Sequence, residues 1–151
     1  MNIDQLDRDI LSILMNNATE SYTKIAKQLH VSGGTVHVRM GKLKEMGVVK
    51  GSNLSIDYSK LGFDISAFLG IYLDKSSLYE EVSQQLESIP EIVSAHYTTG
   101  VYSIFVKIIV RDTKHLREVL HDKIQMIKGI QRTETFISLE ESINRPIIVQ
   151  Q

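Results

Sequence analysis

The sequence predicts an α+β fold in two parts, a front portion of short helices and a rear portion in which two helices pack on one face of an antiparallel sheet. In the first fifty residues, apolar side chains recur at helical spacing. From Ile65 onward, β-prone runs alternate with helical ones in the order strand, helix, strand, strand, helix, strand. Charge divides in a similar way, because residues 1–50 hold seven Lys and Arg against five Asp and Glu, whereas the whole chain has a net charge of −1. A basic front portion is therefore joined to an acidic rear one.

Composition excludes several classes of protein. The 151 residues include no Cys, so a disulfide framework, a thiolate zinc site and a Cys nucleophile are all excluded. Charged side chains interrupt the first twenty residues, which therefore lack the apolar region of a signal peptide. No run in the sequence approaches the roughly 18 apolar residues of a membrane span. We expect a cytoplasmic protein with no membrane partner.

Three short helices are predicted in the front portion. The first follows Asp4, whose charge suits a helix N-terminus, and ends near Asn16. Ser21 and Ser32 are the N-cap residues expected for the second and third helices, and Gly47 is expected to end the third. The inward faces are defined by apolar positions three or four residues apart. They comprise Leu6, Ile10, Ile13 and Leu14, then Tyr22, Ile25, Ala26 and Leu29, then Val36, Met40 and Leu43.

The second and third helices are joined by a tight turn at His30, an arrangement typical of a helix-turn-helix. Beyond the third helix the pattern changes to an alternation that ends at Tyr58 and follows a turn at 50–53. This alternation predicts a small β-hairpin that would act as a wing against the DNA backbone. We therefore expect a winged helix-turn-helix DNA-binding domain over residues 1–58, followed by a linker over 59–64.

The rear portion, residues 65–151, carries four predicted strands and two predicted helices. The strands are 65–73, 92–97, 101–110 and 130–139, and the helices are 77–88 and one that begins at Asp112 or Thr113 and ends near Gly129. This βαββαβ order is that of a ferredoxin-like fold, in which we expect the first and fourth strands to be edges. Phe68, Tyr72 and Phe105 supply more apolar surface than two helices can cover, so the bare sheet face should pair with another subunit.

The third helix is the predicted reading helix. On a helical wheel its outward face holds Gly34, Val38, Gly41, Lys42 and Glu45, flanked by Thr35, His37 and Arg39. The guanidinium fork of Arg39 could bind guanine, and Thr35 and His37 could bond base edges. Lysines nearby could neutralise phosphates, and glycines, which cost roughly 1 kcal/mol each inside a helix, could permit close approach to DNA. The candidate DNA-binding residues are Lys24, Lys27, Ser32, Gly33, Gly34, Thr35, His37, Val38, Arg39 and Lys42. The alternative interpretation is a solvated face, because any three-helix domain shows such a pattern.

The sequence gives little support for catalysis. The five histidines lack metal-ligand spacing, since His115 and His121 lie six residues apart on different faces of a helix. No Walker loop, nucleophile elbow or dinucleotide-binding fingerprint occurs. We therefore expect no catalytic residue, no metal ion and no cofactor.

Two polar clusters in the rear portion could bind a small ligand. The first is the turn at 97–103, where backbone N–H groups near Gly100 could hold a carboxylate. The second is the run 131–135 at the start of the last strand, with Gln125 in the helix before it. Polar residues at a sheet edge also discourage aggregation, so the second cluster has a purely protective interpretation as well.

These residues together resemble the Lrp/AsnC, or feast/famine, family of small transcriptional regulators. The resemblance covers nearly the whole chain, and it is specific because several motifs occur in order and at matching spacing. The motifs are Leu6-Asp7-Arg8-Asp9-Ile10-Leu11, Ile25-Ala26-Lys27-Gln28-Leu29, Val31-Ser32-Gly33-Gly34-Thr35-Val36-His37-Val38-Arg39 and Thr98-Thr99-Gly100-Val101-Tyr102-Ser103. The resemblance implies that the rear domain dimerises through its sheet, assembles dimers into octamers and binds amino acids between dimers.

The effector expected from this resemblance is a small amino acid. Many family members carry Asp where Ser103 stands, and this departure, together with 131–135, is similar to the asparagine-responsive member. The family's reading helix normally has Pro near its start, where Gly33 and Gly34 stand, so base preferences do not transfer. The effector-binding residues implied are Tyr97, Thr99, Gly100, Tyr102, Ser103, Gln125, Gln131, Thr133 and Glu134.

We therefore expect an amino-acid-responsive DNA-binding transcriptional regulator of amino-acid metabolism, with asparagine the favoured effector. Its expected partners are double-stranded DNA, the effector and further copies of the chain. One alternative is an architectural DNA-compacting protein that has no effector. An enzyme is a more distant alternative, because its catalytic residues would have to form a constellation that sequence does not reveal.

Overall fold

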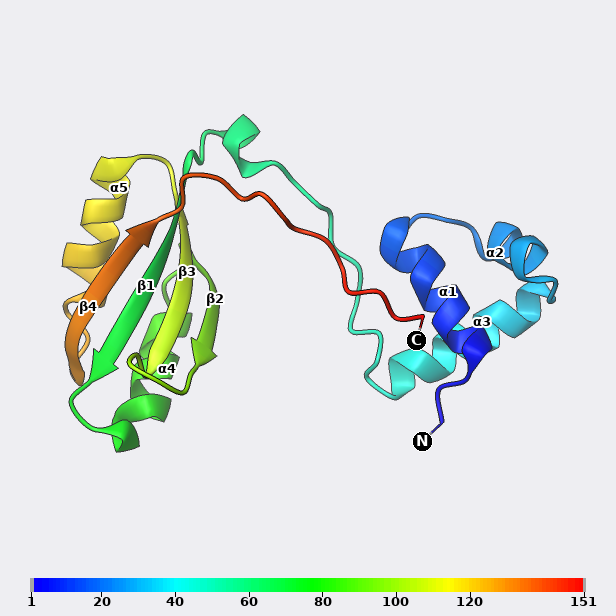
Figure 1. Ribbon diagram of the computed structural model, residues 1–151, viewed down its shortest axis with the longest axis horizontal. Coiled ribbons are helices and arrows are strands. Elements are labelled where there is room, and N and C mark those ends of the chain that lie inside the picture. The colour runs from blue at the N-terminus through cyan, green and yellow to red at the C-terminus, as the bar shows by residue number, and fades with distance from the viewer. Residues whose placement is uncertain (1, 151) are drawn as a thin grey trace. The chain divides into compact units, whose positions relative to one another are not determined.

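The computed structural model describes residues 2–150 (Figure 1). These residues form two compact units. The helical unit contains the residues up to Ser55 together with the segment that begins at Ile143, and the sheet unit is Ile56–Ser142. The expected rear domain, 65–151, therefore differs at its end, because the last residues of the chain pack with the helical unit.

The helical unit contains the expected helices, each capped by the residue that precedes it. They are α1 (Gln5–Asn16), α2 (Tyr22–Leu29) and α3 (Gly33–Glu45). The side chains of Asp4, Ser21 and Ser32 each accept a hydrogen bond from the backbone N–H three residues further on. Capping of this kind satisfies N–H groups that have no partner inside the helix, so the local sequence fixes where each helix begins.

The turn between α2 and α3 depends on His30, which adopts a left-handed conformation with φ of 56°. This conformation directs the chain back so that the Val31 N–H bonds to Ala26 O at 2.9 Å. One apolar core joins the three helices, with Ile10, Ile25 and Val36 fully buried. The helix-turn-helix is confirmed.

The hairpin expected before Tyr58 is not formed, because residues 49–57 contain no strand and run as an extended segment. A two-stranded hairpin needs a packed apolar face to be stable. Here Leu54 is 85% exposed, so the alternating apolar side chains have nothing in the unit to cover them. A short 3₁₀ helix follows at Tyr58–Leu61, where a linker was expected.

The C-terminal segment of the helical unit lies along α1. Arg8 Nη1 donates to Val149 O at 3.2 Å, and Gln150 Nε2 donates to Asp9 Oδ1 at 3.1 Å. Between segment and helix lies a small cavity of about 80 Å³. Its lining comprises Ser12, Met15, Asn16, Pro146, Ile147, Ile148 and Val149. The first and the last residues that the structure describes thus belong to the same unit.

The sheet unit has the expected ferredoxin-like topology. Its strands are β1 (Ile65–Leu73), β2 (Ile92–Tyr97), β3 (Ile104–Val110) and β4 (Ile130–Ile137). They are antiparallel in the order β2-β3-β1-β4. The expectation that the first strand is an edge was wrong, since β1 pairs with both β3 and β4 and the edges are β2 and β4.

Two helical segments cover one face of this sheet (Figure 1). The first is a 3₁₀ turn at Ser76–Leu78 that continues as α4 (Tyr79–Glu87). The second is α5 (Thr113–Glu118), which continues as a π-helical turn over Val119–Ile124 and ends before the position expected from Gly129. The Gln125 N–H bonds to Leu120 O at 2.9 Å, and this wider turn keeps both Val119 and Ile124 buried against the sheet.

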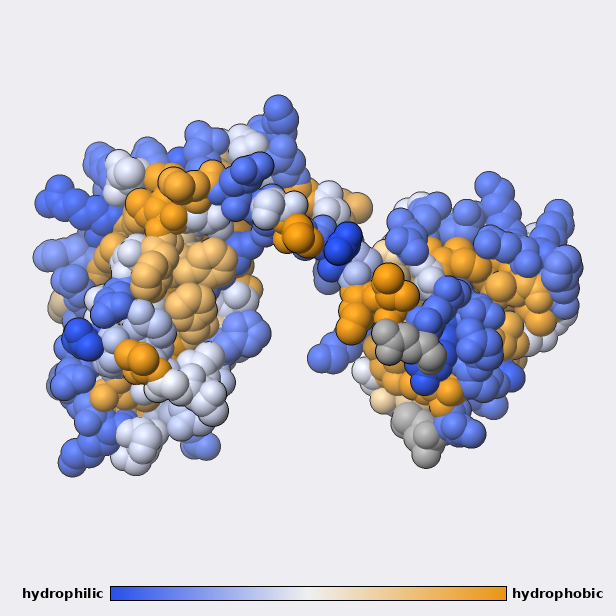
Figure 2. Space-filling view, in the orientation of Figure 1, coloured by the Kyte–Doolittle hydropathy of each residue, from blue (hydrophilic) through white to orange (hydrophobic). Residues whose placement is uncertain are grey.

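The opposite face of the sheet carries no helix. It displays the alternate residues of each strand, among them Phe68 on β1 and Phe105 on β3, whose rings stack at a centroid distance of 5.8 Å. Phe136 on β4 pairs with Phe68 and is 46% exposed. Figure 2 shows apolar side chains gathered over the strands of this unit. We call this surface the open sheet face.

Candidate DNA-binding and effector sites

The outward face of α3 is a continuous accessible surface in the helical unit. His37, Gly41 and Lys42 are exposed, and Val38 is 56% exposed although it is apolar. An exposed β-branched side chain between polar ones is the kind of group that contacts a thymine methyl in a DNA groove.

The start of α3 is held by a pair of hydroxyls. Ser32 Oγ accepts from the Thr35 N–H at 3.1 Å and lies 2.8 Å from Thr35 Oγ1. Gly33 and Gly34 follow the cap, and both are exposed. A Cβ added at Gly33 would meet no atom of the chain within 4 Å, and one added at Gly34 would meet only Ser32 Oγ at 3.8 Å. Packing inside the protein therefore does not require either residue to be glycine.

Lysines of α2 lie beside this surface. Lys24 and Lys27 are exposed, and the Nζ of Lys24 lies 3.9 Å from Glu20 Oε1. An exposed pair of this kind contributes little to stability, so the lysine is free to exchange the carboxylate for a phosphate.

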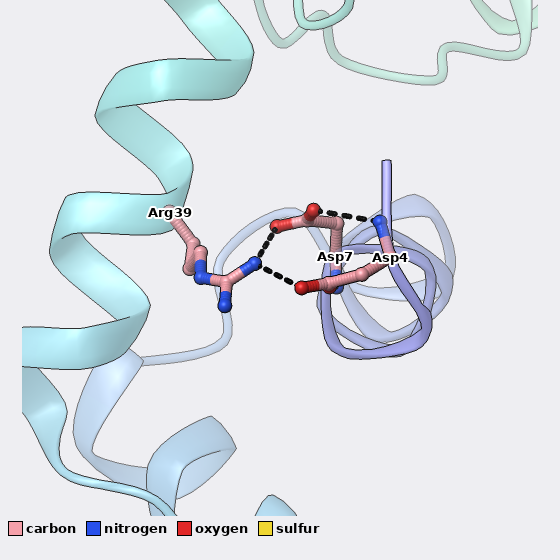
Figure 3. A network of polar contacts seen from close by, with 3 residues as sticks. All are labelled: Asp4, Asp7 and Arg39. Carbon is pink, nitrogen blue, oxygen red and sulfur yellow. Dashed lines mark hydrogen bonds and ion pairs between the residues drawn. The ribbon is translucent and has the colours of Figure 1, made fainter. Parts of the chain in front are cut away.

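Arg39 has a different environment from the one its position on the wheel predicts (Figure 3). Its Nη1 lies 2.5 Å from Asp4 Oδ2 and 3.2 Å from Asp7 Oδ1, so the guanidinium points toward the N-terminus of α1. Asp4 and Asp7 also form a capping box, in which each carboxylate accepts from the other residue's backbone N–H at 3.0 Å. The geometry of Arg39 therefore supports an ion pair with Asp4 and Asp7 and not the expected contact with guanine.

The electrostatics of this network agree with its geometry. The Asp7 backbone N–H, followed by the Arg39 guanidinium, lowers the pKa of the Asp4 carboxyl below its ordinary value. Hydrogen bonds to Asp4 and Asp7 raise the pKa of Arg39. The Asp7 side chain is only 8% exposed, so Arg39 neutralises a buried carboxylate. Sequence reasoning placed Asp4 at a helix N-terminus but missed the connection of Asp4 and Asp7 to α3.

Tyr102 and Glu134 are the two candidate effector residues that the structure brings into direct contact. The Tyr102 hydroxyl donates to Glu134 Oε2 at 2.6 Å, and Tyr72 donates to Oε1 at 3.4 Å. The Glu134 carboxylate raises the pKa of Tyr102 to about 12. The Arg132 guanidinium lies 3.9 Å from the centroid of the Tyr72 ring. This cluster lies on the open sheet face.

The turn that carries Tyr102 is fixed by its own hydrogen bonds. The Ser103 N–H donates to Ile71 O at 2.9 Å, which ties the turn to β1. Thr98 donates twice, through its N–H to Ser103 O at 3.0 Å and through its hydroxyl to Tyr102 O at 2.8 Å. Gly100 lies at the exposed tip with φ of 99°, and Thr99 precedes it there. The backbone at the tip is therefore accessible to a ligand.

The remaining effector candidates lie elsewhere in the sheet unit. Tyr97 pairs with the buried Ile104 and stacks on Tyr79 with a centroid distance of 4.1 Å, so it belongs to the helix-covered face. Thr133 pairs with Ile71 on that same face. Gln125 follows the π-helical turn, and Gln131 lies where the register of β4 shifts. The candidates therefore occupy two faces and do not surround one cavity within a single chain.

The structure also reveals a cluster that sequence reasoning missed. Glu91 Oε1 lies 2.7 Å from Lys123 Nζ and 3.1 Å from His115 Nε2, at the end of the sheet where β2 begins. Burial opposes ionisation of Glu91, but hydrogen bonds from Lys123 and His115 outweigh it and lower the pKa of the carboxyl. The three residues are far apart in sequence and belong to no short motif. Glu91 and His115 line a cavity of about 510 Å³ together with Tyr58 and Phe63.

Within residues 2–150, no three His, Asp or Glu side chains lie close enough together to hold a metal ion. Within the same residues, no helix is long and apolar enough to cross a membrane.

The chain joins a helix-turn-helix to a small sheet domain that carries a polar cluster around Tyr102 and Glu134. This combination defines a DNA-binding regulator with its own sensor domain. Comparison with protein families supports this class. Residues 3–50 match the family model described as winged helix-turn-helix DNA-binding, and residues 66–148 match the Lrp/AsnC ligand binding domain.

The chain belongs to the Lrp/AsnC family of transcriptional regulators. It is 47% identical to the regulatory protein AsnC of Haemophilus influenzae over 97% of each chain, and 46% identical to AsnC of Escherichia coli K12 over 96% of this chain and 95% of that protein. The solved structure of E. coli AsnC superposes with a TM-score of 0.93 at 44% identity, covering 98% of this chain and 99% of that one. The expected α+β fold class and the expected function, an amino-acid-responsive DNA-binding transcriptional regulator, are confirmed.

Proposed function

We propose that this protein regulates transcription in the cytoplasm in response to L-asparagine, and that it acts by reversible binding and not as an enzyme. The DNA-binding part of the proposal is carried by the outward face of α3. Its glycines have no packing role inside the chain and Val38 is exposed, while Lys24, Lys27 and Lys42 supply positive charge around them. In this proposal Ser32 and the N-terminus of α3 face a phosphate, and Thr35, His37 and Val38 face the bases.

The effector part is carried by the contact between Tyr102 and Glu134 beside the accessible turn at Gly100. An amino acid presents an ammonium and a carboxylate. Glu134 offers a negative charge to the first, and backbone N–H groups of the turn offer donors to the second. In this proposal Ser103 distinguishes a side-chain amide, and the relatives that carry the name AsnC favour asparagine.

Assembly into dimers and larger oligomers completes this proposal. The open sheet face exposes stacked aromatic rings that a second copy could cover. The effector candidates on the helix-covered face, Tyr97 and Thr133, would then close the site from a neighbouring subunit. An octamer assembled from dimers is the arrangement that the family resemblance implies.

Thermal unfolding with each of the twenty amino acids tests the sensing function. L-asparagine should raise the Tm, because a ligand that binds only the folded state stabilises it by mass action. Ser103→Ala should reduce this shift, while Ser77→Ala, an exposed serine of the 3₁₀ turn, should leave it unchanged. If none of the amino acids moves the Tm, sensing is excluded.

DNA binding at fixed salt separates the regulator from an architectural DNA-compacting protein. A regulator should bind a fragment that contains its operator more tightly than random DNA of the same length, and L-asparagine should change that affinity. Equal affinity for both fragments, unaffected by amino acids, would favour the architectural function.

A further inference from the structure

Gly70 lies in the middle of β1, a central strand, where glycine is unfavourable. It pairs with Phe105 on β3 and with Glu134 on β4. Glycine inside a strand packs no side chain and loses more backbone entropy than other residues, so its presence usually marks a close approach by another group. Its backbone does not require glycine, because the φ angle of Gly70 is not positive.

The close approach at Gly70 is made by the ring of Tyr102. A Cβ added at Gly70 would lie 2.5 Å from Cδ1 and Cε1 of Tyr102 and 2.7 Å from its Cγ. Real Cβ atoms essentially never approach other atoms so closely, and here all three atoms belong to one ring. By contrast, a Cβ added at Gly33, Gly41 or Gly100 would meet nothing within 4 Å. Gly70 therefore provides a slot for one particular side chain.

Two further aromatic rings pack against the Tyr102 ring in this slot. The Tyr72 ring lies edge-on at a centroid distance of 5.1 Å, and the Phe105 ring lies at 5.9 Å. At its far end the Tyr102 hydroxyl reaches Glu134, which is the cross-strand partner of Gly70. An aromatic ring that covers a strand glycine compensates for the missing side chain, an arrangement known as aromatic rescue.

We propose that Gly70 is a positioning residue for the effector site. Its missing side chain seats the Tyr102 ring, and the seated ring holds the 98–103 turn in the conformation that binds the effector. The physical link is short, because Tyr102 O accepts from Thr98 and the next residue, Ser103, donates to Ile71 O beside Gly70. The statement about the effector rests on the function proposed above, whereas the statement about the slot does not.

A double-mutant cycle of Gly70→Ala and Tyr102→Ala tests the slot without any ligand. Gly70→Ala should lower the Tm in the parent protein, because Cβ and ring cannot occupy the same space. In the Tyr102→Ala background the same substitution should leave the Tm unchanged or raise it, since alanine is better than glycine in an open strand position. Ser66→Ala, on the same face of β1, is a matched control and should change the Tm by the same amount in both backgrounds. If Gly70→Ala lowered the Tm equally in both backgrounds, the slot would be excluded.

Calorimetric titration with L-asparagine tests the positioning role. Gly70→Ala should weaken binding about tenfold or more, the effect of losing one hydrogen bond to a charged group. Tyr102→Phe keeps the ring seated but removes the bond to Glu134, so it should weaken binding while preserving the stability pattern of the cycle. If the slot is confirmed but Gly70→Ala binds L-asparagine as the parent does, the positioning role is wrong. If the parent itself binds no L-asparagine, the proposed effector fails while the cycle still decides the slot.

Discussion

Arg39 on α3 and Asp7 on α1 are joined by an ion pair of 3.2 Å (Figure 3). The same guanidinium nitrogen also contacts Asp4, and the two carboxylates use their other oxygens to cap α1. One network therefore fixes both where α1 begins and how the reading helix is oriented against it. The orientation of α3 depends on this contact as well as on the apolar core.

Removing this contact should destabilise the helical unit. Arg39→Ala leaves Asp7 buried without its cation, so we expect a Tm lower by several degrees and weaker DNA binding as a consequence. Arg39→Lys retains the charge but not the fork, and it should lie between the parent and Arg39→Ala. Thermal unfolding and DNA titration at fixed salt measure the two effects. An unchanged Tm combined with lost DNA affinity would restore the base-reading role.

The lowered pKa of Asp4 makes the stability of this unit sensitive to acid. A carboxyl whose pKa is lower in the folded state stabilises the fold above its unfolded pKa, here the ordinary 3.8, and this contribution disappears as pH falls through the folded pKa. Urea unfolding at a series of acidic pH values should show this loss. Asp4→Asn removes the titrating group, so its stability should depend less steeply on pH over the same range, and an identical slope would contradict the assignment.

The elements that sequence reasoning located correctly are those determined by local signals. Ser21 and Ser32 mark helix starts because a cap acts over three residues, and the strands follow from runs of β-prone residues. The wheel of α3 identified Val38 as exposed for the same reason. It misplaced Arg39, because a wheel treats one helix alone and the partners of Arg39 are on α1.

The failures share a dependence on distant parts of the chain. The alternation before Tyr58 has strand character, but the helical unit offers no surface on which it can pack. The effector residues stay a prediction, because the pleat of the sheet separates Thr133 from Glu134 onto opposite faces and one chain alone does not bring them together. Gly70 gave a local signal, as a glycine within a strand, but the ring that requires it comes from 32 residues further along the sequence.

The C-terminal segment should contribute to the stability of the helical unit. Val149 accepts a hydrogen bond from Arg8 and lines the small cavity against α1. Val149→Asp should therefore increase hydrogen exchange in α1, because it places a charge where an apolar side chain packs. Leu139→Ser is the control, since Leu139 is 99% exposed and its change should leave exchange in α1 as it is. Unaltered exchange in both variants would show that the segment is dispensable.

Tyr102 should make the sheet unit sensitive to alkali. Its pKa is raised from 10.0 to about 12 by Glu134, and a group with a raised pKa stabilises the fold fully below its unfolded value. That contribution should be lost as pH rises from 10 through 12, when the phenolate would face the Glu134 carboxylate. Urea unfolding of the parent and of Tyr102→Phe across this range provides the measurement. The variant should lose less stability than the parent as pH rises. If the unfolding free energies of both proteins fall in parallel with pH, the hydrogen bond to Glu134 is not the cause.

Gly41 on α3 distinguishes a glycine kept for stability from one kept for binding. A Cβ added there meets no atom within 4 Å, so Gly41→Ala should stabilise the helical unit by about 1 kcal/mol, the difference in helix propensity. If the outward face of α3 approaches DNA closely, the same methyl group should weaken binding at fixed salt even though the protein is more stable. A matched change is Ser12→Ala on α1, away from that face, which should leave DNA affinity as in the parent. A more stable Gly41→Ala protein with undiminished affinity would mean that this part of α3 does not enter the groove.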